Sequence, residues 1–471
     1  MTRQVQIVCG QPRQTLQTMT HLAPPRIGRL AYTFSNPTTV RIISRQTARD
    51  APDAVAADGS IIVVEGQGES AWGPVTGIVA TRSAGSSKTD TPLIETPQSV
   101  SVISTTEVKE RGAQSISEAL LGTPGVVTET LGSDVRYDIT SVRGFTPNTF
   151  LNGLSLPLGY LSGTHGLPQV EPYGLERIEV LRGPSSGLYG QVPPGGLLNL
   201  VSKRPTEEAF GEVQLQTGYP GRAQTAFDIG GPVTEDGSLL YRLTGLGRIA
   251  DTQVDTQDEK RLFIAPSFTW RPTDDTTFTF LSSYLKNDSG TTGTMVSAVG
   301  SLYSSPNGRI STSTYLGEKD YDSFKRELGT VGYAFEHRFS DDLIFRQNLQ
   351  YADSKTDNHA IMTNGYVIGS DRLLNRRAAH IINNGTLFSV DNQLQWNVDT
   401  GPLEHKILVG VDYQKFKNEF WYRLGNAPRT IDAYDPNYSG YSPTSWTINN
   451  QKSQDVSHTR HSGGSLALDH R

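Results

Sequence analysis

The sequence predicts a compact α+β domain followed by an antiparallel transmembrane β-barrel. From residue 210 onward, apolar and polar residues alternate in segments of about ten, the length of a tilted membrane strand. Short turns separate some of these segments and long polar loops separate others, and the two kinds of connection alternate. Such alternation is typical of outer-membrane barrels, which have short turns on one side and long loops on the other. The short turns lie at 234–238, 272–275, 340–342 and 399–402, and the long loops at 249–260, 286–326 and 353–386.

The barrel strands are expected to be apolar on one face only. Leu262, Ile264, Phe268 and Trp270 share one face, and Arg346 and Gln350 lie opposite Leu349 and Tyr351. Aromatic residues near strand ends fit interfacial girdles. Nine segments have this pattern: 212–217, 223–230, 241–244, 262–270, 278–284, 331–339, 343–351, 390–398 and 407–413.

The composition of the 471 residues excludes several other classes of protein. Hydrophobic residues make up 35%, the mean hydropathy is -0.40, and no apolar run is long enough for a transmembrane helix. A net charge of -6 argues against a nucleic-acid partner. The single cysteine, Cys9, cannot form an internal disulfide, and neither it nor the scattered histidines match a metal motif. No metal site is therefore expected.

The first 91 residues are expected to be a poorly patterned segment and a linker. Residues 1–57 begin without the apolar core of a signal peptide. Within them, residues 30–43 predict a β-hairpin with a turn at 35–37. Residues 58–91 combine one β-prone run, 58–65, with Gly-, Ser- and Thr-rich flanks that predict mobility. Such a run is a candidate for pairing with a sheet edge on a partner.

Residues 92–205 are predicted to form one α+β unit. Strands are expected at 99–104, 139–145, 178–181 and 197–201, and a strand at 150–151 leads into an Asn-Gly turn. A short helix is expected after an N-cap at Ser115. The stretch 171–205 is the core of the unit, with glycine and proline turns between two apolar strands.

One short motif in this unit indicates a different class of protein, a soluble β-rich hydrolase. Residues 183–187, Gly-Pro-Ser-Ser-Gly, fit the nucleophile elbow of α/β-hydrolases. That motif requires a strand, a sharp turn and a helix, and the nearby Pro193-Pro194-Gly195-Gly196 does not favour a helix. We therefore expect no enzyme activity.

Together these segments resemble the TonB-dependent siderophore receptors. The motifs are PQSVSVI (97–103), SISEALLGTPGV (115–126), SVRGF (141–145), FLNGL (150–154), LERIEVLRGPSSGLYG (175–190) and PPGGLLNLVSKRP (193–205). Within the family, ESAWGP (69–74), SSKTDTP (86–92) and YRLTGLGR (241–248) are most similar to ferrichrome and other hydroxamate-type receptors.

The resemblance implies a plug domain, 92–205, inside an outer-membrane barrel of 22 strands, of which 206–471 would supply about nine. An Fe(III)-siderophore would bind on the external side and carry the iron itself, so no cofactor or protein metal ligand is implied. TonB, energised by ExbB and ExbD, would pair with the linker segment. The matching TonB box comprises Asp58, Ser60, Ile61, Ile62, Val63 and Val64.

Four plug residues are implied to anchor the plug to the barrel wall: Arg143, Arg177, Glu179 and Arg182. Charges flanking buried strands need partners, and the resemblance places those partners on acidic barrel residues. Glu176 is expected to extend the same network.

The expected ligand pocket departs from the ferrichrome pattern. The arginine that follows the TPGV segment in those receptors is replaced by Leu131. Replacement contacts are expected from Tyr160, Trp421 and Tyr422, because aromatic walls suit a bulky chelate.

Nine strands are too few to close a plugged barrel, and an open edge in lipid leaves backbone groups unpaired. The sequence is therefore expected to be a truncated receptor, monomeric and of outer-membrane type. A receptor for a non-iron ligand and a non-functional fragment remain open as alternatives.

Overall fold

A computed structural model describes residues 3–8, 26–27, 30–36, 39–44, 69–75, 77–130, 132, 134–157, 167–291, 296–401, 403–425, 430–438, 440, 442–443, 445–446 and 451–470. The chain divides into two units, residues 11–68 and residues 1–10 with 69–471. In the smaller unit, β2 (Arg26–Ile27), β3 (Leu30–Asn36) and β4 (Thr39–Ser44) form an antiparallel sheet in that order. Tyr32 lies opposite Ile42. The hairpin predicted over 30–43 is confirmed.

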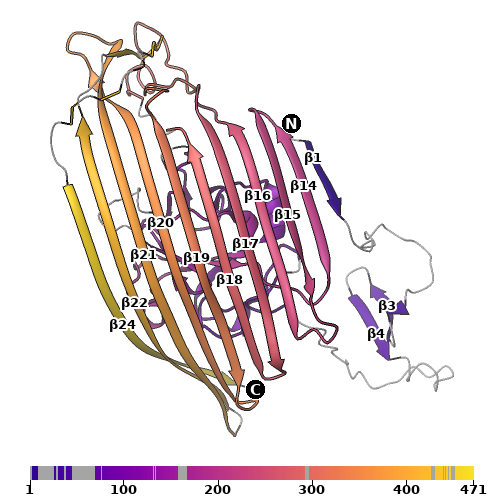
Figure 1. Ribbon diagram of the computed structural model, residues 1–471. Helices are drawn as coiled ribbons and strands as arrows, with labels where there is room; N and C mark the ends of the chain where they lie inside the picture. Colours follow the sequence, from indigo (N-terminus) through magenta and orange to yellow (C-terminus); the bar gives the residue numbers. More distant parts are fainter. Residues whose placement is uncertain are drawn as a thin grey trace. The chain divides into compact units, whose positions relative to one another are not determined.

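The larger unit contains a twelve-stranded sheet, drawn in Figure 1 from magenta to yellow except for its indigo edge strand β1. Its order is β1-β14-β15-β16-β17-β18-β19-β20-β21-β22-β24, with β23 (Ile431–Asp432) also paired to β21. All of these strands pair antiparallel. The long strands are β14 (Phe210–Gly218), β15 (Arg222–Pro232), β16 (Leu239–Asp251), β17 (Asp258–Thr273), β18 (Thr276–Ser289), β19 (Ser323–Arg338), β20 (Leu343–Tyr366), β21 (Leu373–Thr400), β22 (Leu403–Gly425) and β24 (Gln451–His470), and the edge strand β1 is Arg3–Val8.

The nine predicted strands correspond to β14 through β22, and the four predicted short turns fall between consecutive strands. Two expectations are wrong. Residues 353–386 are not a loop, because β20 and β21 continue through them and pair from His359 with His380 outward to Tyr366 with Leu374. β24 is a further strand, which pairs with β22 through backbone bonds although its sequence lacks an apolar face.

The two faces of the large sheet differ as predicted. Leu262, Phe268 and Trp270 of β17 are exposed, while Arg261 and Thr269 between them are buried. Arg346 and Gln350 of β20 are likewise buried and Tyr351 is exposed. One face of the sheet therefore presents large apolar side chains outward, and the other packs polar side chains against the rest of the unit.

The plug, residues 92–205, is built on a five-stranded sheet of order β11-β10-β13-β12-β7, in which β10 and β13 are parallel. The strands are β7 (Ser99–Ser104), β10 (Asn148–Leu151), β11 (Leu154–Ser155), β12 (Leu175–Arg182) and β13 (Gly196–Ser202). The smaller elements are β5 (Arg82–Ser83), β6 (Thr91–Pro92), η1 (Leu93–Glu95), α1 (Thr105–Arg111), α2 (Ile116–Ala119), β8 (Val126–Thr128), β9 (Thr140–Val142), η3 (Pro172–Gly174) and α3 (Ser186–Tyr189).

Most predicted plug elements are present. Ser115 caps α2 by accepting a hydrogen bond from the Glu118 backbone N–H at 3.1 Å. The strand predicted over 139–145 ends at Val142, because Arg143 and Gly144 form a turn with φ of 50° and 84°. α1 was not predicted, although Ser104 and Glu107 have the spacing of a capping box and Ser104 caps this helix. Among the described residues, no helix has the length and apolar character needed to cross a membrane.

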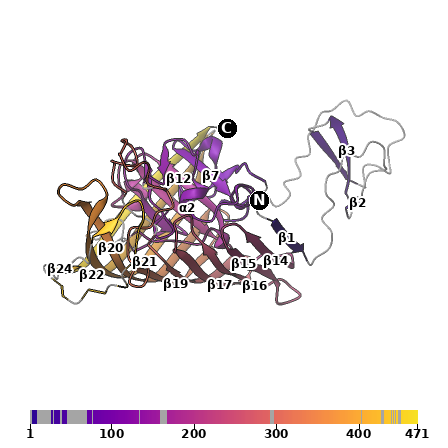
Figure 2. The same ribbon diagram turned by 90° about the horizontal axis from the view of Figure 1, so that it is seen from above.

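The plug and the large sheet share one hydrophobic core. It includes Ile178 and Leu200 from the plug and Leu246, Phe263 and Ala352 from β16, β17 and β20. Figure 2 shows β7, β12 and α2 on the inner side of the curved sheet. The polar face of the sheet is therefore the face that meets the plug.

Candidate functional site

The linker between residues 69 and 91 is held against the plug by Arg177 of β12. Its side chain is buried, with 1% of the residue exposed. The guanidinium donates to the carbonyl oxygens of Ser70 at 2.6 Å, Gly73 at 3.1 Å and Arg82 at 2.9 Å. The carboxylate of Glu69 lies 3.5 Å away. A buried guanidinium must be fully hydrogen-bonded, so these contacts fix the linker in place.

Glu179, two residues along the same strand, makes a second contact with the linker. Its carboxylate accepts hydrogen bonds from the Ser83 hydroxyl at 2.9 Å and the Asn199 amide at 2.8 Å. Burial raises the pKa of Glu179 above its ordinary value. Tyr189 donates to the carbonyl of Gly85 at 2.5 Å. The mobility predicted for residues 83–91 is therefore wrong, because buried polar groups of the plug bind this stretch.

The linker also reaches the large sheet. Lys88 forms an ion pair of 2.7 Å with Asp391 of β21, and both side chains are largely buried. The guanidinium of Arg346 in β20 lies over the ring of Trp72, 5.2 Å from its centroid. The linker is thus bound to both the plug and the sheet wall.

Arg182 has its partners inside the plug. It donates to the carbonyl of Pro124 at 2.7 Å, to the Ser99 hydroxyl at 2.9 Å and to the Ser101 hydroxyl. Burial lowers the pKa of Arg182, and the positive charge of the exposed, nearby Arg143 lowers that pKa further. Arg177, Glu179 and Arg182 therefore pair with plug and linker groups, and not with acidic residues of the described strands. The implied anchoring role of these three residues has no counterpart among the described strands, because their polar atoms bind groups of the linker and of the plug itself.

Two buried ionic clusters cross between plug and sheet instead. In the first, the Arg242 cluster, Arg242 of β16 contacts Glu176 of the plug at 3.2 Å and Asp228 of β15 at 2.8 Å. Lys203, at the end of the plug, pairs with Asp228 at 2.8 Å. Burial lowers the pKa of Lys203, and the carboxylate of Asp228 opposes that effect. Glu176 extends to the sheet, as expected.

The second, the Arg261 cluster, joins η3 to β16 and β17. Arg261 pairs with Glu171 of the plug at 3.0 Å and with Glu259 at 2.8 Å. Arg248 adds a contact of 3.1 Å with Glu259. All four side chains are at most 6% exposed. Two arginines and two carboxylates balance in charge, which a buried cluster requires.

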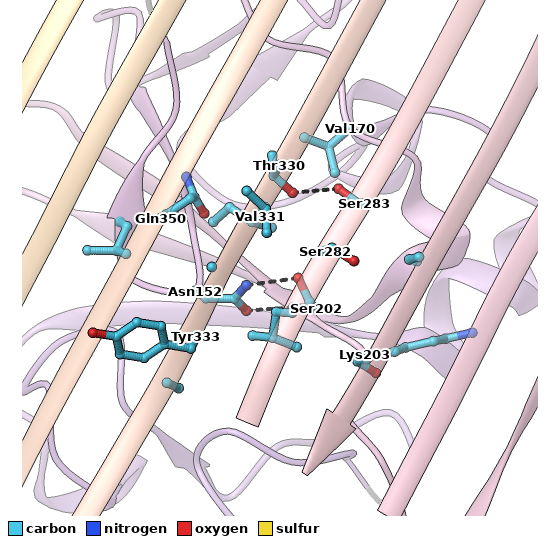
Figure 3. Close-up of a pocket in the computed structure, with 18 of the residues that line it drawn as sticks. Asn152, Val170, Ser202, Lys203, Ser282, Ser283, Thr330, Val331, Tyr333 and Gln350 are labelled. Carbon is cyan, nitrogen blue, oxygen red and sulfur yellow. Dashed lines mark hydrogen bonds between the residues drawn. The ribbon is translucent and has the colours of Figure 1, made fainter. Parts of the chain in front are cut away.

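A cavity of about 40 Å³ lies between the plug and β17 to β20 (Figure 3). Asn152 and Ser202 of the plug bond to each other on one side of it, with 2.9 Å between the amide nitrogen and the hydroxyl. Ser283 and Thr330 of the sheet bond at 2.7 Å on the other. A space of this size holds a few water molecules at most and cannot admit an iron chelate.

Trp421 and Tyr422, two of the residues expected to contact the ligand, lie on opposite faces of β22. The strand register places Trp421 opposite Ile382 and Tyr422 opposite Ile381. Ile381 is buried against the plug side, so Tyr422 shares that side and Trp421 projects from the opposite face. The prediction that both line one pocket is therefore wrong, and Tyr422 remains the candidate. Tyr160 and the TonB box, Asp58 to Val64, lie outside the described residues.

The nucleophile-elbow motif does have a helical turn after it, contrary to the expectation. α3 begins at Ser186, although it has only four residues. Ser185 is buried, and its hydroxyl accepts from the Gln98 amide at 2.7 Å. Its other contact is with the Gly183 carbonyl at 3.5 Å, so the described contacts give it no imidazole base.

The residues that carry the plug–sheet contact were mostly missed by sequence reasoning. Glu171, Asp228, Glu259 and Arg261 were not singled out, although an arginine on the polar face of a membrane strand signals a buried partner. Their partners are distant in sequence, so no local pattern links them.

Comparison with known proteins agrees with the fold. Residues 92–197 match the family model described as TonB-dependent Receptor Plug Domain. The chain is 39% identical over 396 residues to the ferrichrome outer membrane transporter/phage receptor of Escherichia coli K12, covering 78% of this chain and 52% of that protein. It is 39% identical over 372 residues to the ferrioxamine receptor of Yersinia enterocolitica, covering 78% and 51%. The chain thus spans about half the length of the curated relatives it matches.

Among solved structures, the ferric-catecholate import receptor Fiu from E. coli K12 in its closed form superimposes with a TM-score of 0.73. The identity is 20%, over 85% of this chain and 57% of that chain. These relatives are named as receptors and transporters, which agrees with the expectation that the protein is not an enzyme. The chain therefore carries the plug domain of the TonB-dependent receptors, followed by antiparallel strands in a large sheet, and its homologues include the ferrichrome and ferrioxamine receptors.

Proposed function

We propose that this chain forms the plug and part of the wall of an outer-membrane receptor that binds an Fe(III)-siderophore of hydroxamate type and imports it with energy from TonB. The observation that carries the proposal is the linker bound by Arg177, in a plug that is itself tied to the wall by the Arg242 and Arg261 clusters. A transport plug needs two kinds of contact, one that a pull on the linker can release and one that keeps the plug seated. The names of the relatives supply the substrate class.

The outward apolar side chains of β16 to β22 support a membrane location. Leu262, Trp270 and Trp396 are about half exposed on that face. Exposed apolar side chains in such a continuous band are stable when lipid covers them. On this proposal the partners are outer-membrane lipid and TonB with ExbB and ExbD, and the receptor acts as a monomer without a resident cofactor.

The test uses radioiron uptake. Because the chain spans about half of the ferrichrome relative, it is joined to a signal peptide and to further barrel strands of that relative that complete the wall. The completed receptor is expressed in a Gram-negative strain that lacks its own ferrichrome and ferrioxamine receptors. We expect binding of radioiron-loaded ferrichrome or ferrioxamine B on ice, and uptake only in energised cells that contain TonB. A folded, outer-membrane-located chain that binds neither siderophore would contradict the proposal and favour a non-iron ligand or a non-functional fragment.

A further inference from the structure

Two histidines and an aspartate meet on the large sheet away from the plug contacts. His359 of β20 and His380 of β21 are direct partners in the strand register. Asp357 precedes His359 by two positions on β20, so its side chain points to the same face. His380 lies on the next strand, far along the chain from Asp357 and His359, and the three match no metal motif, so only strand pairing brings His380 to the other two.

The three side chains converge on one point. Nε2 of His380 lies 2.9 Å from Oδ1 of Asp357, and Nδ1 of His359 lies 3.4 Å from the same oxygen. The two imidazole rings stack with centroids 4.0 Å apart and planes at 15°. One potential ligand atom from each residue lies within 4.8 Å of the other two.

These separations are close to those of a metal site. Ligands about 2.1 Å from a tetrahedral Zn²⁺ ion lie about 3.4 Å from one another. Small side-chain rotations would therefore place an ion between the three atoms. Two imidazoles and one carboxylate, with further positions open to water, suit Zn²⁺ and similar divalent transition metals.

The surroundings favour a defined site over a chance contact. All three residues are half-buried and lie within long paired strands, which limits their motion. Tyr321 packs edge-on against His359 with ring centroids 5.4 Å apart, and Trp446 lies 6.0 Å from His380. The site thus has two aromatic walls.

The site lies beyond the apolar part of its face. Asp357 and His359 alternate with buried Thr356 and Asn358, so they project from the face that carries exposed Tyr351. From Tyr351 toward the long-loop end, that face of β20 carries Asp353, Lys355 and then Asp357. Polar neighbours of this kind leave the site open to water and dissolved metal.

We propose that Asp357, His359 and His380 bind a single divalent transition-metal ion, with Zn²⁺ the best fit, and that the ion fastens β20 to β21 beyond the apolar band. The site does not depend on the proposed siderophore function, in which iron arrives inside its chelator. The competing explanation is a protonated histidine paired with Asp357, which needs no metal.

A Zn²⁺ titration separates the two explanations. The chain is stripped with chelator, kept in detergent micelles at neutral pH and titrated calorimetrically with zinc chloride. We expect His359→Gln and His380→Gln to bind one equivalent fewer than the parent. The matched control is His405→Gln on β22, a histidine that contacts Thr400 and lies outside the cluster; it should keep the parent's stoichiometry. Equal stoichiometry in the parent and both cluster variants would overturn the proposal.

If circular dichroism shows that a histidine variant does not fold, a milder variant still tests the metal site. Asp357→Asn keeps the size of the side chain and removes its charge. Its Zn²⁺ affinity should fall by at least the roughly 10- to 100-fold that changes around metal ligands cause. An unchanged affinity would refute the assignment.

A spectroscopic measurement locates the ion. Cu²⁺ bound at this site should quench the fluorescence of Trp446, so Trp446→Phe should lose a saturable quenching component that the parent shows. The quenching should vanish on acidification, because protonated imidazole cannot bind metal. Identical quenching in Trp446→Phe would place the ion elsewhere and contradict the proposal.

Discussion

Replacing Arg177 by methionine should release the linker from the plug. Methionine replaces the apolar stem of the side chain but leaves the carbonyls of Ser70, Gly73 and Arg82 without their donor. Each buried carbonyl left unsatisfied costs about 1–3 kcal/mol, so the docked linker would lose about 3–9 kcal/mol if it stayed dry. The linker can instead detach and expose these groups to water, which limits the loss to the free energy of docking.

Even the lower bound of about 3 kcal/mol would raise the population of the released linker by roughly 100-fold. Hydrogen exchange measures this directly at two amides inside the linker contact. The Lys88 amide donates to Ala84 at 2.7 Å, and the Leu93 amide donates to Thr81 at 2.8 Å. Both should exchange faster in the variant, and trypsin should cut faster after Arg82.

Arg271→Met is the matched control. Arg271 is an exposed arginine paired with Glu207, and exposed pairs of this kind contribute little. Its variant should leave linker exchange at the parent level. If Arg177→Met also exchanged at the parent level in a folded chain, the linker would be held by other contacts and the reasoning would fail.

Three further predictions concern the plug. Glu171→Gln should lower the thermal midpoint of the folded chain in detergent through a loss of about 3–5 kcal/mol, because two buried arginines of the Arg261 cluster would then share the single carboxylate of Glu259. The exposed control Glu207→Gln should not lower it, and equal midpoints would show that the Arg261 cluster is not a docking contact. Burial raises the pKa of Asp138 to about 6 from an unfolded value near 3.8. The protonated carboxyl therefore stabilises the plug at low pH, and about 3 kcal/mol of folding stability is lost as pH rises through 6. Asp138→Asn should flatten the dependence of thermal midpoint on pH between 4 and 7, and a slope equal to the parent's would assign it to another group. Ser186→Ala and Ser185→Ala should both leave siderophore binding unchanged. Ser185→Ala should also lose about 1 kcal/mol of stability, because it removes the hydrogen bond from Gln98. If the parent hydrolysed esters and either change removed that activity, the assignment as a receptor would be contradicted.

The sequence predicted the strands of the sheet well, because each membrane-type strand carries its own signal. Leu262, Phe268 and Trp270 alternate with polar residues in sequence, and the same alternation separates exposed from buried side chains in the structure. The prediction from sequence failed for residues 353–386, where β20 and β21 run past the apolar band. Beyond the band, one face carries polar residues such as Lys355 and Asp357, and the other buries polar residues such as Asn358. The alternation that marks a membrane strand is therefore absent, and the sequence resembles a loop.

The candidate site was predicted less completely. Arg177, Glu179 and Arg182 were recognised as buried charges needing partners, because they flank apolar strands. Their partners were assigned to the wrong element: the acceptors are backbone carbonyls of the linker and of Pro124, and a carbonyl leaves no trace in a sequence. Trp421 and Tyr422 show the same limit, since adjacent residues on a strand face opposite sides and only register tells which side is which.

The sequence by itself determined the class of fold, the strand periods and the motifs of the plug, because these depend on residues close together in the chain. Tertiary structure decided which charges meet. Glu171 finds Arg261, Glu176 finds Arg242, and Lys88 finds Asp391 only when the plug packs against the sheet. His359 and His380 become neighbours through the pairing of β20 with β21. Buried charges are stable only when they are paired or fully hydrogen-bonded, and packing of the plug against the sheet supplies partners that local sequence cannot reveal.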